Sequence, residues 1–129
     1  MKLAGLNSKL RSKRNTGQYY EAAAEKHLSA CGLELIERNF LAKSGEIDLV
    51  MRDGAAIVFV EVRYRSSQAF GHAAETVTYR KMKKLQKAAS IWLMKQGMSI
   101  HSTDFRFDVV AIHQQGQQIE WIKNAITQG

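Results

Sequence analysis

Charged residues inside two apolar segments are the strongest chemical signal in this sequence. The segment GEIDLV places Asp48 among aliphatic residues, and the segment FVEVR places Glu61 and Arg63 two residues apart. Buried strands seldom hold charge, and residues two apart on a strand project from the same face. For an isolated Glu-x-Arg, an ion pair between Glu61 and Arg63 is the simpler interpretation. The added Asp48 favours a site in which two carboxylates supply oxygen ligands to a divalent cation.

The two acidic segments are expected to be neighbouring antiparallel strands, because the Asp-Gly pair at positions 53–54 is a strong hairpin signal. A two-residue loop there pairs Asp48 with Phe59, which is diagonal to Glu61, so all three side chains share one face. The same register places Glu46 opposite Glu61, which is an unfavourable pair of like charges. Either a bulge separates these two residues or Glu46 takes part in the same acidic site.

Basic residues suggest the partner. Lys and Arg number 19 against 12 Asp and Glu, and this net charge of +7 favours a polyanion, usually nucleic acid. Two blocks, residues 1–14 and 76–103, contain basic residues and no acid. The alternative is a plain solvated surface, but clustering in blocks favours contact with nucleic acid. The candidate residues are Lys13 and Arg14 in the first block, and Arg80, Lys83, Lys84 and Lys87, which recur at helical spacing, in the second.

The elements that must position these residues follow from hydrophobic periodicity. Helices are predicted over about residues 17–31 and 76–96. Strand-like runs cover residues 33–40, 45–52, 55–64, 104–113 and 118–123. This order predicts an α/β fold with a mixed central sheet flanked by helices. The second helix is expected to be a right-handed crossover that makes the third and fourth strands parallel.

Length and composition limit the organisation of the chain. Its 129 residues fit one domain, predicted over 16–129, and residues 1–15 are predicted to be a basic flexible arm. A single Cys excludes an internal disulfide and a Cys-rich zinc site. No apolar run approaches the roughly 20 residues of a membrane span, and the N-terminus lacks the apolar region of a secretory signal. We expect a cytoplasmic protein without a membrane partner, and the oligomeric state, homodimer included, stays open.

For two other sets of residues a structural role is favoured over a functional one. Arg106 and Asp108 share one strand face, and an ion pair is favoured there over a place in the site. The rings of Tyr19, Tyr20 and Tyr64 are of the kind that stacks on nucleobases. Packing in the core or at its rim is the favoured interpretation for these tyrosines.

Taken together, the motifs resemble the PD-(D/E)xK nuclease superfamily. The matching stretches are T-G-x-x-x-E-x-x-A in 16–24, R-N-F at 38–40, G-E-I-D-L-V, F-V-E-V-R-Y-R, and R-F-D-V-V-A-I in 106–112. The chain resembles the YraN family of bacterial proteins still more closely, over about residues 16–123. It is similar to the archaeal Holliday-junction resolvases at the level of the fold and the site. The resemblance implies a restriction-endonuclease-like α-β-β-β-α-β core.

The resemblance also implies a role for each matching residue. Asp48 matches the principal metal ligand and Glu61 the second, while Val62 between Glu61 and Arg63 would lend its backbone carbonyl. Glu21 matches an acid of the first helix that assists through water or a second metal. Arg63 stands where the superfamily has the Lys that orients or activates water. Because Arg stays charged, it stabilises phosphoryl charge but does not accept a proton.

Three functions are weighed from these residues. The first is a nuclease-like hydrolase of DNA phosphodiesters, branched DNA included, with weakly bound Mg²⁺ or Mn²⁺ and no organic cofactor. The second is a nucleic-acid-binding module in which Arg63 marks impaired catalysis. The third is an assembly partner whose basic arm binds an acidic protein. Only the first needs Asp48, Glu61 and Glu21 together, and acids without a metal would repel phosphate.

Overall fold

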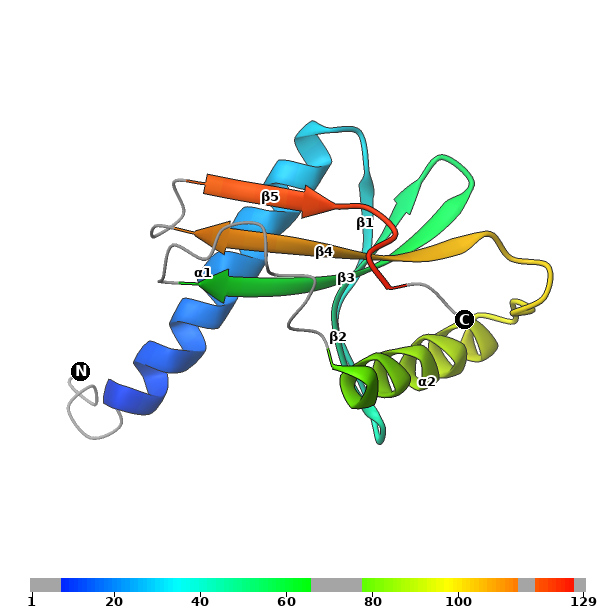
Figure 1. The fold of residues 1–129 in the computed structure, drawn as a ribbon, viewed down its shortest axis with the longest axis horizontal. Coiled ribbons are helices and arrows are strands. Elements are labelled where there is room, and N and C mark those ends of the chain that lie inside the picture. The colour runs from blue at the N-terminus through cyan, green and yellow to red at the C-terminus, as the bar shows by residue number, and fades with distance from the viewer. Residues whose placement is uncertain (1–7, 66–77, 114–117, 127–129) are drawn as a thin grey trace.

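The computed structural model of the chain describes residues 8–65, 78–113 and 118–126, with the side chains of 8–16 and of 65 left out (Figure 1). The described residues form α1 (Ser8–Ala30), β1 (Glu34–Ala42), β2 (Gly45–Asp53), β3 (Ala56–Arg65), α2 (Tyr79–Lys95), β4 (Phe105–His113) and β5 (Gln118–Ile122). The α/β class and the α-β-β-β-α-β core predicted from the sequence are confirmed. No helix among the described residues is long and apolar enough to cross a membrane.

The five strands form one mixed sheet in the order β1-β2-β3-β4-β5. Strands β3 and β4 are parallel, and the other neighbouring pairs are antiparallel. A parallel pair needs a long connection, and α2 supplies it between β3 and β4 (Figure 1). The predicted parallel pairing is therefore confirmed.

The helices cover opposite faces of the sheet, which makes three layers (Figure 1). On one face α1 packs its Tyr20, Ala24 and Leu28 against Val58, Val60, Val110 and Ile112. On the other face α2 packs its Leu85, Ala89 and Trp92 against Val50, Ile57, Phe59 and Phe107. Consecutive residues of β3 thus bury themselves on both faces, as the apolar run IVFV predicts for a covered central strand.

Helix α1 begins at Ser8, although its start was predicted near Gly17. The segment SKLRSKRN contains neither Pro nor Gly and is rich in Lys and Arg, which favour helix. The helix therefore runs through the second half of the segment that was assigned to a flexible arm. Residues 1–7 lie outside the described part of the chain, and there the arm stays a prediction.

The hairpin between β2 and β3 has a register that differs from the predicted one. Asp53 pairs with Ala56, because the turn is formed by Gly54, with φ of +62°, and Ala55 rather than by Asp53 and Gly54. The predicted pairing of Asp48 with the residue at position 59 is therefore wrong by two residues. Side chains alternate with a period of two, so an even shift leaves the paired residues from Leu49 to Asp53 on the faces that alternation predicts.

The corrected register also removes the like-charge pair expected at Glu46. The last pair of β2 and β3 is Leu49 with Val60, and Glu46 pairs with Leu41 of β1 instead. The predicted opposition of Glu46 and Glu61 is therefore wrong. The residues that follow the last pair are Asp48 and Glu61 themselves.

Asp108 organises the far end of the sheet, as the predicted ion pair requires. Its fully buried carboxylate accepts hydrogen bonds from Arg106 Nε at 3.0 Å, Trp121 Nε1 at 2.9 Å and the Asn124 N–H at 2.8 Å. Arg106 also donates to Asp53 Oδ2 at 3.0 Å. This network joins β4 to β5 and to the β2–β3 hairpin, so the structural assignment of Arg106 and Asp108 is confirmed.

Candidate functional site

Strand β2 turns over at Asp48. Ile47 packs on the α2 face and Leu49 on the α1 face, although residues two apart normally share a face. The pairing of β2 with β3 stops at the same point, with Leu49. The two strands therefore separate just where Asp48 and Glu61 lie, and a cavity opens between them.

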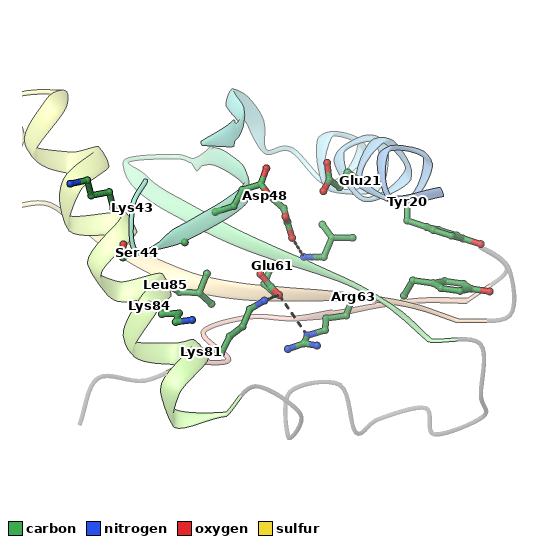
Figure 2. A pocket seen from close by; sticks show the side chains of 15 residues that line it. Tyr20, Glu21, Lys43, Ser44, Asp48, Glu61, Arg63, Lys81, Lys84 and Leu85 are labelled. Carbon is green, nitrogen blue, oxygen red and sulfur yellow. Dashed lines mark hydrogen bonds and ion pairs between the residues drawn. The ribbon is translucent and has the colours of Figure 1, made fainter. Parts of the chain in front are cut away.

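The Asp48 carboxylate is held by the backbone of β3. The Val62 N–H donates a hydrogen bond of 2.9 Å to Asp48 Oδ2 (Figure 2). A backbone donor beyond the end of a strand ladder still needs an acceptor, and this carboxylate supplies it. The contact fixes the side chain of Asp48 at the edge of the opening.

The cavity has a volume of about 740 Å³ and lies between α1, the β1–β2 hairpin, β3 and α2 (Figure 2). Its lining includes the acids Glu21, Glu46, Asp48 and Glu61, the cations Lys43, Arg63, Lys81 and Lys84, and the aromatic residues Tyr20 and Tyr64. The predicted catalytic residues Glu21, Asp48, Glu61 and Arg63 thus line one cavity. A site of this composition attracts cations at its floor and anions at its rim.

The acids in the cavity act on one another. Burial raises the pKa of Asp48 to about 8, with the negative charge of Glu61 as the next cause and those of Glu21 and Glu46 as smaller ones. The Val62 N–H opposes this by stabilising the carboxylate, but it is outweighed. Asp48 therefore holds a proton near neutral pH unless another cation takes the proton's place.

Glu61 is buried, with 6% of its surface exposed, and two cations neutralise it. Lys81 Nζ of α2 lies 3.0 Å from Glu61 Oε2, and Arg63 Nε lies 3.7 Å from the same oxygen (Figure 2). The ion pair expected between Glu61 and Arg63 is therefore present, and it is the longer of the two contacts. Burying a carboxylate is costly unless cations of this kind pair with it.

Glu21 reaches the cavity from α1 and is oriented by β1. Asn39 donates a hydrogen bond of 2.9 Å from Nδ2 to Glu21 Oε1. One turn further along the helix, Glu25 binds Arg38 of β1 at 2.8 Å. These two contacts fix the rotation of α1 against β1, so that Glu21 faces the acids of the sheet.

The residues present fit a hard divalent cation. Asp48 and Glu61 offer carboxylate oxygens, the ligands that Mg²⁺ prefers, and a bound cation would offset both the burial of Asp48 and the negative charge of its neighbours. Across the described residues, three acidic, His or Cys side chains do not converge on one point. An ion would therefore keep several water ligands, which is usual for Mg²⁺. The Val62 carbonyl stays a predicted ligand, while its N–H is seen to contact Asp48.

A second hollow of about 510 Å³ adjoins the cavity on the side of α2. It is lined by Lys43, Ser44, Tyr79, Arg80, Lys83, Lys84 and Lys87. Lys43, Ser44 and Lys84 line both spaces, so the two lie side by side. We call this second space the cationic groove. It gathers the four basic residues predicted in α2, whereas Lys13 and Arg14 lie in α1 with side chains outside the description.

Lys81 and Lys43 were not among the predicted site residues. Lys81 lies four residues before Leu85 and therefore continues the apolar face of α2 toward the sheet. A cation on a core-facing stripe is a signal that was available in the sequence. Lys43 follows β1 directly, and only the docking of the β1–β2 hairpin against α2 brings it to the cavity.

Comparison with known proteins places the chain among close relatives. The sequence model of the "Uncharacterised protein family UPF0102" matches residues 20–112. The UPF0102 protein of Aliivibrio salmonicida is 57% identical over 118 residues, which is 92% of this chain and 96% of the relative. UPF0102 proteins of Vibrio cholerae and Photobacterium profundum are 55% and 52% identical, over 90% and 92% of this chain and 95% and 94% of their own length. The resemblance to the YraN family is thus confirmed, and the chain belongs to this family, UPF0102.

Proposed function

We propose that this protein is a Mg²⁺- or Mn²⁺-dependent nuclease-like hydrolase of phosphodiester bonds, with DNA as the favoured substrate and the cytoplasm as the place where it acts. The observation that carries the proposal is one cavity that joins Asp48 and Glu61 to a rim of lysines. Carboxylates without cations would repel a phosphodiester, and lysines without acids would only bind it. The combination suits an anionic substrate that is handled through a divalent ion.

The four predicted catalytic residues and Lys81 each have a part in this proposal. Asp48 and Glu61 would hold the ion, and Glu21 would orient water beside it. A bound Mg²⁺ would supply a more acidic water and neutralise charge on the phosphate. Arg63 and Lys81, both within 4 Å of Glu61, would donate to the phosphate oxygens as charge develops.

The cationic groove gives the substrate a path away from the reacting phosphate. Arg80, Lys83, Lys84 and Lys87 are all exposed along it, so they are free to follow a phosphate backbone. Contacts of this type position nucleic acid and carry no sequence information. The proposal therefore includes recognition by backbone and shape rather than by base sequence.

A second candidate function is a nucleic-acid-binding module without catalysis. The contact between Lys81 and Glu61 favours it, because a neutralised Glu61 no longer repels phosphate in the absence of a metal. Arg63 also favours this module, because it stands where the superfamily has a Lys. The two candidates differ in whether divalent ions produce cleavage or only alter binding.

Cleavage assays separate the two. Single-stranded, duplex, nicked and branched DNA, and matching RNA, would be incubated with purified protein in Mg²⁺ or Mn²⁺. Cleavage that is lost in Asp48→Asn and Glu61→Gln, and kept in the control Glu25→Gln, supports the hydrolase. Glu25 is a fair control because it lies on the same helix as Glu21 but pairs with Arg38. Binding without cleavage of any substrate supports the module.

A further inference from the structure

The two ends of the cavity differ in chemistry, since one is cationic and the other aromatic. Binding or cleaving a phosphate does not by itself require an aromatic wall. Lys43 and Lys84 lie at one end, Tyr20 lies at the other, and Asp48 and Glu61 lie between them (Figure 2). A phosphate held at the carboxylates therefore has cations on one side and an aromatic wall on the other. At about 740 Å³ the cavity also has room for much more than a hydrated ion.

The aromatic wall is built from two stacked rings. The ring centroids of Tyr20 and Tyr64 are 4.2 Å apart, with planes inclined by 14°. Tyr20 is 7% exposed and belongs to the core beneath α1, so it holds the ring of Tyr64 in place. Tyr64 itself is 37% exposed, and Tyr19, set edge-on to Tyr20 at 5.0 Å, is 60% exposed.

Core packing accounts for Tyr20 but not for its neighbours. A residue that only fills the core has no need of exposed aromatic surface beside a charged cavity. Exposed aromatic rings next to cationic residues are the usual means of binding unpaired bases, because every base has a face that stacks. Tyr64 directly follows Arg63, so the stacking surface and a phosphate donor come from adjacent positions of β3.

We propose that Tyr64, supported by Tyr20, stacks on an unpaired nucleobase whose phosphate lies at Asp48 and Glu61. The inference rests on the proposed function and narrows its substrate class. A base in a continuous duplex is already stacked and paired, and it must leave the helix to reach such a ring. The substrates favoured are therefore single strands, strand ends and branched nucleic acids with a splayed nucleotide.

The test measures binding without divalent ions, so that it does not depend on cleavage. Anisotropy would compare a short single-stranded DNA with an abasic sugar-phosphate strand of equal length and charge. Stacking on one aromatic ring predicts about tenfold tighter binding of the strand with bases, within the range known for base stacking. Tyr64→Leu should remove this preference and leave the affinity for the abasic strand unchanged.

Two variants control the experiment. Tyr64→Phe keeps the stacking face and should keep the preference. Tyr79→Leu removes the rival stacking ring, an exposed tyrosine beside the lysines of the cationic groove, and the preference should survive it if Tyr64 is the stacking residue. Equal binding of both strands by the wild type, or a preference that survives Tyr64→Leu, would overturn the inference. So would loss of the preference in Tyr79→Leu alone.

A measurement on the wild-type protein guards against a variant that does not fold. A strand carrying 5-iodouracil cross-links on irradiation to aromatic residues that stack on the base. Mass spectrometry should locate the cross-link at Tyr64, and a cross-link at Tyr79 instead would overturn the inference. Cleavage without base preference would remove the inference alone, whereas base preference without cleavage would remove only the hydrolase.

Discussion

The backbone N–H of Val62 donates a hydrogen bond of 2.9 Å to Oδ2 of Asp48. This bond joins β2 to β3 just beyond their last regular pair, Leu49 with Val60. The carboxylate is therefore oriented by a backbone group. The fold already fixes the position of that group, whereas a flexible side chain would have to be ordered first. A site whose ligand is fixed before binding loses less entropy when it takes up an ion.

The first prediction concerns metal binding at Asp48. Mg²⁺ or Mn²⁺ should raise the melting temperature of the wild type, because an ion that binds only the folded state stabilises it. At about 100 times its dissociation constant the ion would contribute about 2.7 kcal/mol, a shift of several degrees. Asp48→Asn should lose most of this response, while Glu25→Gln should keep it. Calorimetric titration with Mn²⁺ provides a direct check, and equal responses in wild type and Asp48→Asn would exclude the site.

The second prediction follows from the raised pKa of Asp48. The pKa of Asp48 is about 8 in the folded protein, against an ordinary value of 3.8 that applies to the unfolded chain. Between these two values the folded state binds a proton on Asp48 that the unfolded state does not. Stability without metal should therefore fall as the pH rises from about 5 to about 8. Asp48→Asn removes this contribution. As the pH rises over that range, the free energy of unfolding of the variant should therefore increase relative to that of the wild type. Each pKa unit corresponds to about 1.4 kcal/mol, so the gain should be easily measurable.

Urea titrations in EDTA at several pH values measure this difference. The two curves should be closest at the acid end and farthest apart near pH 8, and added Mg²⁺ should bring them together again. Parallel curves for wild type and Asp48→Asn would mean that Asp48 titrates normally. Neither burial nor the neighbouring negative charges would then act on Asp48 as proposed.

The third prediction concerns Arg63. Lys at this position restores the residue typical of the superfamily, so Arg63→Lys should retain or raise cleavage. Arg63→Ala removes a fixed donor and should lower the rate by about 10²- to 10³-fold. Single-turnover cleavage on the preferred DNA measures both. An Ala variant as fast as the wild type would leave Lys81, the nearer partner of Glu61, as the donor that matters.

The sequence identified both carboxylates because charge in an apolar strand conflicts with burial. That conflict is local, and Asp48 and Glu61 show it without any knowledge of the fold. The two carboxylates still line one cavity, because the error in the hairpin register was an even number of residues. Glu21 was different, since only the family resemblance singled it out among the polar residues of α1.

The parts that the sequence did not reveal depend on docking between elements. The turn lies one position later than predicted, because Gly54, in its left-handed conformation, is the first residue of the turn rather than the second. The 3.0 Å contact between Lys81 and Glu61 depends on how α2 lies across the sheet. The stack of Tyr20 on Tyr64 likewise joins α1 to β3, which are far apart in sequence.

The fourth prediction separates stability from the candidate site. Asp108→Ala removes the buried acceptor shared by Arg106, Trp121 and the Asn124 backbone. Breaking a buried charged network by removing one partner costs about 3–5 kcal/mol. Urea unfolding should show a loss of this size, and the folded fraction should still respond to Mg²⁺ because Asp108 does not line the cavity. A loss below about 1 kcal/mol would contradict the structural role of Asp108.

The last prediction concerns the cationic groove, and salt dependence is its measure. Each phosphate neutralised on duplex DNA contributes about 0.9 to the slope of log affinity against log salt. Replacing Lys83, Lys84 and Lys87 by Gln should therefore flatten the slope by roughly two to three units. The loss of affinity should be similar for all DNA sequences, because phosphate contacts do not read bases. The fold should be unaffected, since all three side chains are exposed.

A second triple variant shows whether position or mere charge is responsible. Lys26, Lys95 and Lys123 are exposed and line neither the cavity nor the cationic groove, so their replacement by Gln removes the same charge elsewhere. Long-range attraction falls off within about 10 Å at moderate salt, so this control should change the slope far less. Equal slopes for the two triple variants would mean that net charge alone attracts DNA. An unchanged slope in the groove variant would mean that this stripe of α2 faces plain solvent, and the DNA path would have to lie elsewhere on the molecule.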